Sequence, residues 1–253
     1  MIPKIIHFCW YGNGEFNDLT KKCITSWKER LPDYTIKIWN EENTPFDKLP
    51  FLKLLYKQKK WAFVSDYMRL YALYKEGGVY LDTDIEILKR FDDLHKKENF
   101  TGFQTDMDSS PNPIGAGIIG AKKGSKFILD CIKETEIKQR LKFNAMGSPI
   151  ILTKVLKNYG LSEYKTQEIN DVLVLEKEYF YPYYINEEFT QDCVRQETIC
   201  IHWWEYSWKN KEKGFNYYLD SITRKLQKLP LLLLEKLVYL FKGEKFYYIN
   251  NKI

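Results

Sequence analysis

Residues 61–84 read WAFVSDYMRLYALYKEGGVYLDTD. Apolar residues recur at helical spacing over 61–75, and Gly77 is placed to cap the C-terminus of that helix. A short β-branched and aromatic strand, Val79 to Leu81, follows and ends at Asp82-Thr83-Asp84. Two carboxylates one residue apart at a strand end can share a hard divalent cation, which takes its other ligands from water and substrate phosphates. The stretch therefore predicts a site for a metal and a diphosphate.

The segments before this stretch predict a sheet of the α/β class. Ile5 to Trp10 is short, apolar and β-branched like a buried strand, Asp18 to Arg30 has helical spacing, and Tyr34 to Trp39 alternates like a second strand. Strand, helix and strand in this order open a parallel α/β sheet. Further strands are expected over 114–121, 172–175 and 198–202, and further helices over 124–136 and from Ser148.

The overall composition fits a globular protein with one large domain. The chain has 253 residues, of which 44% are hydrophobic and 29% charged, and its net charge of +5 is too mild for a nucleic-acid-binding protein. Its 19 Tyr, 15 Phe and 7 Trp favour stacking on sugars or bases, or simply a core filled with rings. The five cysteines lack CxxC spacing, so we expect reduced thiols in a cytosolic protein. We expect no secretory signal, and no apolar run approaches the roughly 20 residues that cross a bilayer.

Polar residues on the 61–75 helix lie within one turn of each other. Ser65, Asp66 and Arg69 include an i,i+3 pair on one helix face. A carboxylate can bind sugar hydroxyls, and a guanidinium can bind phosphate or hold the carboxylate in place. On an arbitrary helix a surface ion pair would be the better interpretation. Here the helix leads directly into Asp82-Thr83-Asp84, which favours a binding role.

A second polar and aromatic group stands near the C-terminus, where residues 202–208 read HWWEYSW. A histidine at a strand end beside three tryptophans can complete a metal site or cover a bound donor, and a core histidine among packing rings is the alternative. His7, inside the first apolar strand, is expected to be structural. A calcium loop of the EF-hand kind lacks its further oxygen ligands here. The two carboxylates of a glycosidase must flank a bond from opposite sides, which residues 82 and 84 do not fit.

Together, these segments resemble the DXD-containing sugar transferases, a family that includes the yeast initiating α-1,6-mannosyltransferase, bacterial capsular polysaccharide transferases and the clostridial glucosylating toxins. The resemblance covers residues 2–210 and is densest over 65–84. The matching segments are Ile2–Trp10, Ser26–Lys28, Pro32–Tyr34, Ser65–Asp84, Gly117–Lys122, Gly147–Pro149 and His202–Trp208.

The resemblance implies a GT-A fold, which is one Rossmann-like α/β domain that binds a nucleotide-sugar and Mn²⁺ (or Mg²⁺). It places the donor at Cys9, Trp10 and Tyr11, with Trp10 stacked on the base. It also implies that Ser207 and Trp208 are lid residues that reach the diphosphate.

The same resemblance assigns roles around the paired aspartates. Ser65, Asp66 and Arg69 would hold ribose, sugar and phosphate, and Tyr80 would lie on the diphosphate side. The resemblance implies that Asp66, Arg69 and Asp82 form the catalytic set and that Asp84 is the direct metal ligand, assisted by Asp82 and His202, with Glu205 as an alternative ligand to His202. Where the toxins carry an Asn-Gln-Gly contact to the donor sugar, this chain has Gly115-Ala116-Gly117, and Asn112 or Asn144 could replace that contact.

The resemblance implies a retaining hexosyltransferase that uses a nucleotide-sugar, with a UDP-sugar favoured over GDP-mannose, and a saccharide acceptor in capsular or other surface polysaccharide synthesis. A protein-glucosylating transferase and a catalytically silent nucleotide-sugar-binding module are the alternatives. The silent module would be expected to lack Asp82, Asp84 or Arg69, and all three are present. A nucleotidyltransferase would need a richer phosphate loop than residues 11–14 offer.

The C-terminal stretch differs in character from the rest. We expect a GT-A domain over 1–221 and an amphipathic, basic helical tail over 222–253. Leucines at helical spacing within 224–242, with lysines among them, suit either a helix in the membrane interface or a closing helix on the core. The first interpretation predicts a cytoplasmic enzyme peripheral on the inner face of the cell membrane. The resemblance to bacterial polysaccharide transferases implies a lipid-linked acceptor there.

Overall fold

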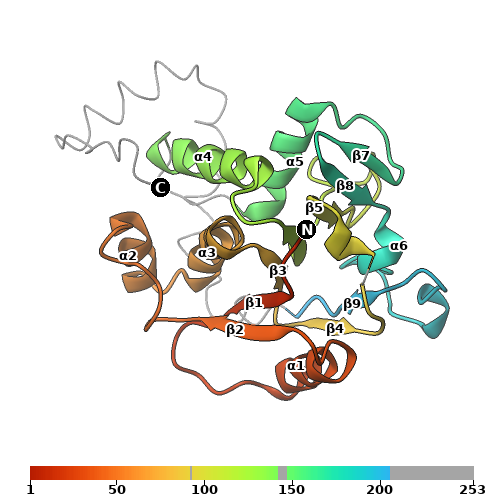
Figure 1. Cartoon of the computed structure of the whole chain (residues 1–253), viewed down its shortest axis with the longest axis horizontal. Coiled ribbons are helices and arrows are strands. Elements are labelled where there is room, and N and C mark those ends of the chain that lie inside the picture. Colours follow the sequence, from red (N-terminus) through yellow and green to blue (C-terminus); the bar gives the residue numbers. More distant parts are fainter. Residues whose placement is uncertain (92, 142–146, 206–253) are drawn as a thin grey trace. The chain divides into compact units, whose positions relative to one another are not determined.

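The computed structural model describes residues 1–91, 93–141 and 147–205 (Figure 1). One compact unit comprises Met1–Thr135 with Met146–Glu205, and a second comprises Glu136–Ala145 with Tyr206–Ile253. Several expectations fall outside the described residues: the roles of Asn144, Ser207 and Trp208, the domain boundary at 221, and the amphipathic helix in the tail.

A seven-stranded sheet forms the centre of the first unit, in the order β2-β1-β3-β6-β5-β8-β7. Its strands are β1 (Ile5–Cys9), β2 (Thr35–Trp39), β3 (Gly78–Leu81), β5 (Asn99–Gly102), β6 (Ile118–Ala121), β7 (Gln167–Ile169) and β8 (Val172–Leu175). The β1–β2, β1–β3 and β5–β8 pairs are parallel, whereas β6 is antiparallel to both β3 and β5. The expected parallel opening is confirmed, and the complete sheet is mixed.

Two short strands form a separate antiparallel ribbon. β4 (Ile85–Ile87) follows β3 directly, and β9 (Cys200–His202) pairs with it in the register Ile85↔His202. Because Asp84 precedes β4 and His202 ends β9, this register places the two residues side by side although they are far apart in sequence.

The helices within the described residues are α1 (Asp18–Arg30), α2 (Pro50–Lys57), α3 (Trp61–Glu76), α4 (Lys126–Leu141), α5 (Ser148–Tyr159) and α6 (Lys177–Phe180). Short 3-10 turns cover Leu94–Lys96 and Gln191–Cys193. As predicted, α3 ends at Gly77, whose φ of 69° lies in the left-handed region and whose N–H donates to the Leu73 carbonyl. The predicted helix at Ser148 is confirmed.

Three expected elements are present with bounds that differ from the expected ones. The expected strand over 114–121 is regular only in β6, and Ile114 forms an isolated antiparallel bridge with Phe103. The helix expected from 124 begins at Lys126 and ends at Leu141. The strand expected over 198–202 is reduced to β9.

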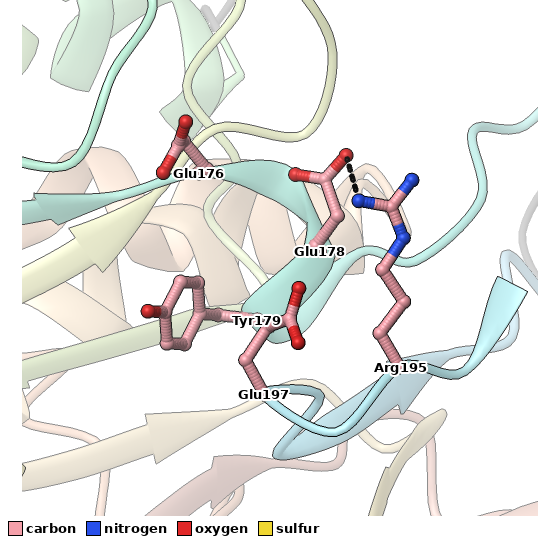
Figure 2. Close-up of a pocket in the computed structure, with 5 residues that line it drawn as sticks. All are labelled: Glu176, Glu178, Tyr179, Arg195 and Glu197. Atoms are coloured by element: carbon pink, nitrogen blue, oxygen red, sulfur yellow. Dashed lines mark ion pairs between the residues drawn. The ribbon is translucent and has the colours of Figure 1, made fainter.

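A pocket of about 370 Å³ lies beside α6 (Figure 2). Its lining combines three carboxylates with one guanidinium and one phenol ring: Glu176, Glu178, Tyr179, Arg195 and Glu197. In Figure 2 the Arg195 guanidinium faces the Glu178 carboxylate, at 3.8 Å between Nη1 and Oε1. None of these residues belongs to the site that the sequence predicts.

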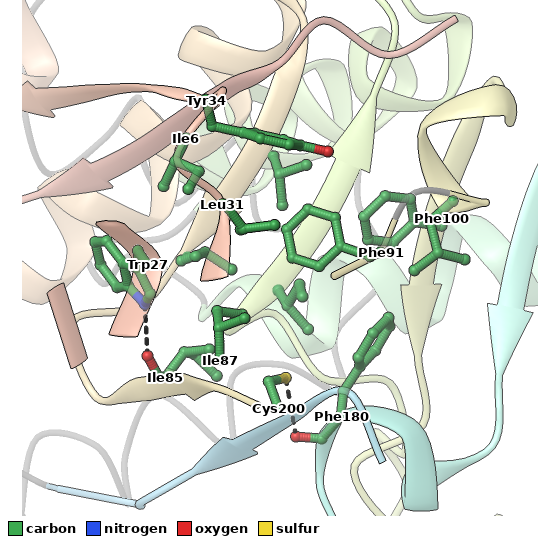
Figure 3. Packing of buried hydrophobic residues seen from close by; sticks show 14 of the residues in the cluster. Ile6, Trp27, Leu31, Tyr34, Ile85, Ile87, Phe91, Phe100, Phe180 and Cys200 are labelled. Carbon is green, nitrogen blue, oxygen red and sulfur yellow. Dashed lines mark hydrogen bonds between the residues drawn. The ribbon is translucent and has the colours of Figure 1, made fainter. Parts of the chain in front are cut away.

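Aromatic rings fill much of the core between α1 and the sheet (Figure 3). Trp27 is fully buried there, and its indole N–H donates to the Ile85 carbonyl at 2.7 Å. Phe100 packs against Phe91 and Phe180, with ring centroids 6.4 and 5.9 Å apart. These contacts account for part of the aromatic content without a ligand. Trp27 in addition ties α1 to the first residue of β4.

His7 has the structural role that its apolar strand predicts. Its Nδ1 accepts from the Trp39 indole at 3.1 Å, so Nε2 carries the proton and donates to the Gly77 carbonyl at 2.8 Å. Burial lowers the pKa of this imidazole, although the bond to Gly77 opposes the shift. His7 therefore holds the end of α3 against β1 and fixes where β3 begins.

Candidate active site

The two aspartates lie where β3 leaves the sheet. The Asp82 N–H donates to the Gly117 carbonyl at 2.8 Å, and the Ile85 N–H donates to the Asp82 carbonyl at 3.0 Å, which makes a tight turn. Asp84 is buried, at 8% exposed, whereas Asp82 is half-buried. The turn therefore presents both carboxylates on one short segment, as the sequence predicts.

His202 completes a group of three possible metal ligands. Its Nε2 lies 3.2 Å from Asp84 Oδ1, while the Glu205 N–H donates to Asp84 Oδ2 at 2.9 Å. One ligand atom from each of Asp82, Asp84 and His202 lies within 4.8 Å of the others. Two carboxylates and one imidazole form a donor set that suits a divalent ion such as Mn²⁺.

The electrostatics of this group fit a bound cation. Burial disfavours charge on His202, but the neighbouring Asp84 carboxylate raises the pKa of the imidazole above its ordinary value. Burial likewise opposes ionisation of Asp84, yet His202 and the Glu205 N–H hold the pKa of that carboxyl below its usual range. The pair thus attracts positive charge, and a metal ion at this point would take the place of the proton.

The surroundings of these ligands also leave a place for a bound group. Two buried nitrogens at this site, Arg69 Nε and His202 Nδ1, are among the buried polar atoms of the described residues that have no hydrogen-bond partner within the protein. A Cβ on Gly117 would lie 3.2 Å from Asp82 Oδ2 and 3.4 Å from His202 Nε2. Glycine at 117 therefore keeps the space between the two ligands free of a side chain.

Arg69 links the aspartates to α3 and to the loop before β6. Its Nη1 donates to the Ala116 carbonyl at 2.6 Å and lies 3.2 Å from Asp82 Oδ1, while Nη2 lies 3.1 Å from Asp66 Oδ1. The guanidinium also stacks 4.5 Å above the Tyr80 ring. Burial opposes the charge on Arg69, but the surrounding carboxylates outweigh it and raise the pKa further.

Asp66 and Tyr80 are fixed by the same network. The Tyr80 hydroxyl donates to Asp82 Oδ1 at 2.9 Å. Ser148, the first residue of α5, donates its hydroxyl to Asp66 Oδ1 at 2.7 Å. Burial raises the pKa of Asp66, and the Arg69 charge works against that shift. The i,i+3 pair of Asp66 and Arg69 is therefore a buried pair, not a surface one.

Residues 9–11, at the end of β1, differ in their surroundings. Cys9 is buried beside Arg69 and Asp82, and burial raises the pKa of its thiol to about 12, so it is an inert neighbour of the cluster. Trp10 is half-buried and meets Phe16 edge to face at 4.9 Å. Tyr11 is buried, with its hydroxyl 2.7 Å from Thr44 Oγ1.

The structure therefore brings most of the sequence-predicted residues together, but not all of them. Hydrogen bonds, ion pairs or ring contacts join these residues: Asp66, Arg69, Tyr80, Asp82, Asp84 and His202. Ser65 is half-buried on α3 one residue before Asp66. The Tyr11 side chain bonds Thr44 and also interacts with Cys9, which in turn interacts with Tyr80 and Arg69.

Four groups that make contacts within the site were given no role by the sequence: Ser148, the Ala116 carbonyl, the Glu205 N–H and Tyr181. The Tyr181 hydroxyl accepts from the Ile118 N–H at 3.2 Å, and its ring packs edge-on against His202 at 5.5 Å. Two of the four are backbone groups, so the residue types at these positions do not indicate their role. Ser148 lies in a segment that matches the family, and only that match could have drawn attention to it.

Comparisons with known proteins agree with this geometry. Residues 17–101 match the sequence model of a family described as the glycosyltransferase sugar-binding region containing a DXD motif. The inositol phosphoceramide mannosyltransferase 3 of Schizosaccharomyces pombe is 27% identical over 52% of this chain and 36% of its own length. A mannosyl phosphorylinositol ceramide synthase of Saccharomyces cerevisiae is 27% identical over 63% of this chain and 43% of its own. The chain thus spans less than half the length of these curated relatives.

The fold is also that of a solved glycosyltransferase. The PaToxG glycosyltransferase superposes with a TM-score of 0.51 at 21% identity, covering 62% of this chain and 69% of that one. This likeness shows the fold, which is that of the GT-A class. The match to the family of DXD-containing glycosyltransferases covers residues 17–101, the stretch that holds both aspartates.

Proposed function

We propose that the chain transfers a hexose from a nucleotide-sugar to a saccharide acceptor, with a divalent cation and with retention of configuration. The observation that carries this proposal is the convergence of Asp82, Asp84 and His202 beside the buried Arg69. Three metal-binding side chains next to a guanidinium suit the diphosphate of a nucleotide-sugar, since both the cation and Arg69 oppose its negative charge.

The proposed chemistry is a substitution on one face of the sugar. The bond between the sugar C1 and the diphosphate oxygen breaks, and a bond from C1 to the acceptor oxygen forms on the same face. The acceptor proton goes to the departing diphosphate oxygen. A bound divalent cation would neutralise charge on the diphosphate as it leaves. Arg69 supplies a fixed positive charge at the same point, and its bonds to Asp82, Asp66 and Ala116 hold it there before reaction.

A UDP-hexose is the donor that we favour, because the set of Trp10, Asp66 and Arg69 is most similar to that of UDP-sugar enzymes. GDP-mannose is the second candidate, since the names of both curated relatives refer to mannosyl transfer. A hydrolysis screen of UDP-glucose, UDP-galactose, their N-acetyl forms and GDP-mannose with Mn²⁺ tests both. A silent binding module would bind a nucleotide-sugar without releasing sugar, so binding with no turnover for any donor, acceptors included, would reject the transferase.

We expect Trp10 to form one wall of the base pocket, because it follows β1 at the carboxyl end of the parallel strands, where ligands of open α/β sheets bind. A stacked base contributes on the order of 1–3 kcal/mol. Trp10→Ala should therefore weaken UDP binding about tenfold, measured by calorimetry. Phe16→Leu is the control for the edge-on contact that Trp10 makes within the protein. Unchanged affinity in Trp10→Ala would place the base elsewhere.

The acceptor that we favour is a lipid-linked saccharide, in synthesis of a capsule or another surface polysaccharide. A protein acceptor is the alternative. The curated relatives' names contain inositol phosphoceramide and phosphorylinositol ceramide, which are lipids, and this supports a lipid-borne acceptor. No helix within the described residues is long and apolar enough to cross a membrane.

Attachment to the cytoplasmic membrane surface through 224–242 would bring the enzyme to such an acceptor. We expect the full chain to float with vesicles that contain anionic lipid, and a chain that ends at Ser221 to stay in the soluble fraction, because the lysines of 224–242 would bind anionic headgroups. Neutral vesicles are the control for the charge. If both proteins remain with the soluble fraction, the membrane proposal fails.

A further inference from the structure

The first turn of α1 is connected to the segment that follows β9. Asn17 is the N-cap of α1, where its Oδ1 accepts from the Thr20 N–H at 2.8 Å. The other end of the same amide, Nδ2, donates to Glu205 Oε2 at 2.9 Å. A single side chain thus closes a helix near the N-terminus and holds a residue that lies 188 positions later.

Glu205 in turn bonds the candidate metal ligand. Its backbone N–H donates to Asp84 Oδ2 at 2.9 Å, while Asp84 Oδ1 lies 3.2 Å from His202 Nε2. The two oxygens of Asp84 therefore have different partners. With Oδ2 fixed by Glu205, the carboxylate cannot rotate freely, and Oδ1 stays on the His202 side.

The rest of α1 supports the β4–β9 ribbon in the same way. Ser26 Oγ accepts from the Ile87 N–H at 2.9 Å, and Lys22 Nζ lies 2.7 Å from Glu86 Oε2. The Trp203 indole donates to that same Glu86 oxygen at 2.9 Å. Asn17 adds a contact from α1 to Glu205, whose N–H donates to Asp84.

We propose that Asn17 is a positioning residue for the metal site: by holding Glu205, it keeps the Glu205 N–H on Asp84 Oδ2 and so presents Oδ1 to the cation. The proposal rests on metal binding by Asp82, Asp84 and His202 in the proposed function. Its distinctive consequence is that a side chain at the start of α1 sets metal affinity without touching the metal.

Asn17→Ser separates this role from helix capping. Serine caps helices about as well as asparagine, but it carries no amide that could donate to Glu205. We expect the full-length Asn17→Ser protein to lose hydrogen-exchange protection at the Glu205 amide, measured by NMR, while α1 amides keep theirs. Its Mn²⁺ affinity in the presence of UDP, measured from the free-ion electron paramagnetic resonance signal, should fall about fivefold, which is the effect of one ordinary hydrogen bond.

Matched variants locate the effect. Glu205→Ala keeps the backbone N–H but removes the acceptor for Asn17, so it should weaken Mn²⁺ binding as much as Asn17→Ser. The double variant should add nothing further, as for two residues that act through one contact. Asp18→Asn, an equally small change in the first turn of α1, should leave Mn²⁺ affinity unchanged.

The possible outcomes separate this proposal from the proposed function. Unchanged protection at Glu205 in Asn17→Ser overturns the positioning role, and so does lost protection with unchanged Mn²⁺ affinity. In both cases the metal site itself stands. If the wild-type protein binds no Mn²⁺ with UDP, the metal-dependent function is rejected and the positioning role with it.

Discussion

Asp84→Ala is expected to abolish sugar transfer, with a fall in kcat of at least about 100-fold, the size of effect seen when one group that stabilises transition-state charge is removed. Asp84 is buried and lies 3.2 Å from His202, so the variant loses a ligand and also leaves the imidazole without its partner. Asp84→Asn keeps the volume of the side chain but lacks the charge, and it should be nearly as inactive. The measurement is the initial rate of donor hydrolysis with Mn²⁺.

Circular dichroism should show both Asp84 variants folded, because the β4–β9 ribbon keeps its attachments to α1 through Ser26 and Trp27. Asp33→Asn makes the same chemical change at an exposed carboxylate that pairs with Lys4, and it should retain full activity. A fully active Asp84→Ala protein would contradict the assignment. Wild-type turnover that persists in excess chelator would contradict it equally.

Local pattern was enough to predict the centre of this site. The glycine pair that ends α3, the short apolar β3 and the two aspartates after it are adjacent in sequence, so helix, strand and turn signals agree with one another over 61–84. The β1–α1–β2 opening was predictable for the same reason, because each element carries its own period.

Contacts that depend on long-range pairing were not predictable in this way. The antiparallel direction of β6 and the pairing of β4 with β9 are set by how distant segments pack, and no local signal records them. α2 was missed because it has only eight residues and no side-chain cap, with Pro50 as its one start signal. The Ala116 carbonyl and the Glu205 N–H belong to the backbone, so residue type gave no indication of their role.

Arg69→Met should be the most destabilising of these substitutions. Arg69 is 7% exposed and pairs with Asp66 and Asp82, so methionine leaves buried negative charge without its counter-ion. Removing one partner of a buried pair typically costs about 3–5 kcal/mol. We expect a loss of this size in the free energy of unfolding, measured in urea at pH 7. Activity should also fall at least about 100-fold, since the diphosphate loses its fixed positive charge.

The cause of the lower stability of Arg69→Met can be tested, because Asp66, which this variant leaves without its counter-ion, is titratable. Burial already raises the pKa of Asp66 in the wild-type protein against the Arg69 charge, and without that charge the pKa must rise further. A folded-state pKa above the unfolded value makes the variant lose stability as the pH rises through that range, so its loss of stability relative to the wild type should become smaller as the pH falls from 7 to 5.

Asp66→Asn in the Arg69→Met background should recover part of the stability at pH 7. Arg195→Met removes an exposed guanidinium that lies 3.8 Å from Glu178, and should cost no more than about 1 kcal/mol. A deficit in Arg69→Met that is equally small, or that does not change with pH, would show that the pair with Asp66 contributes little to the fold.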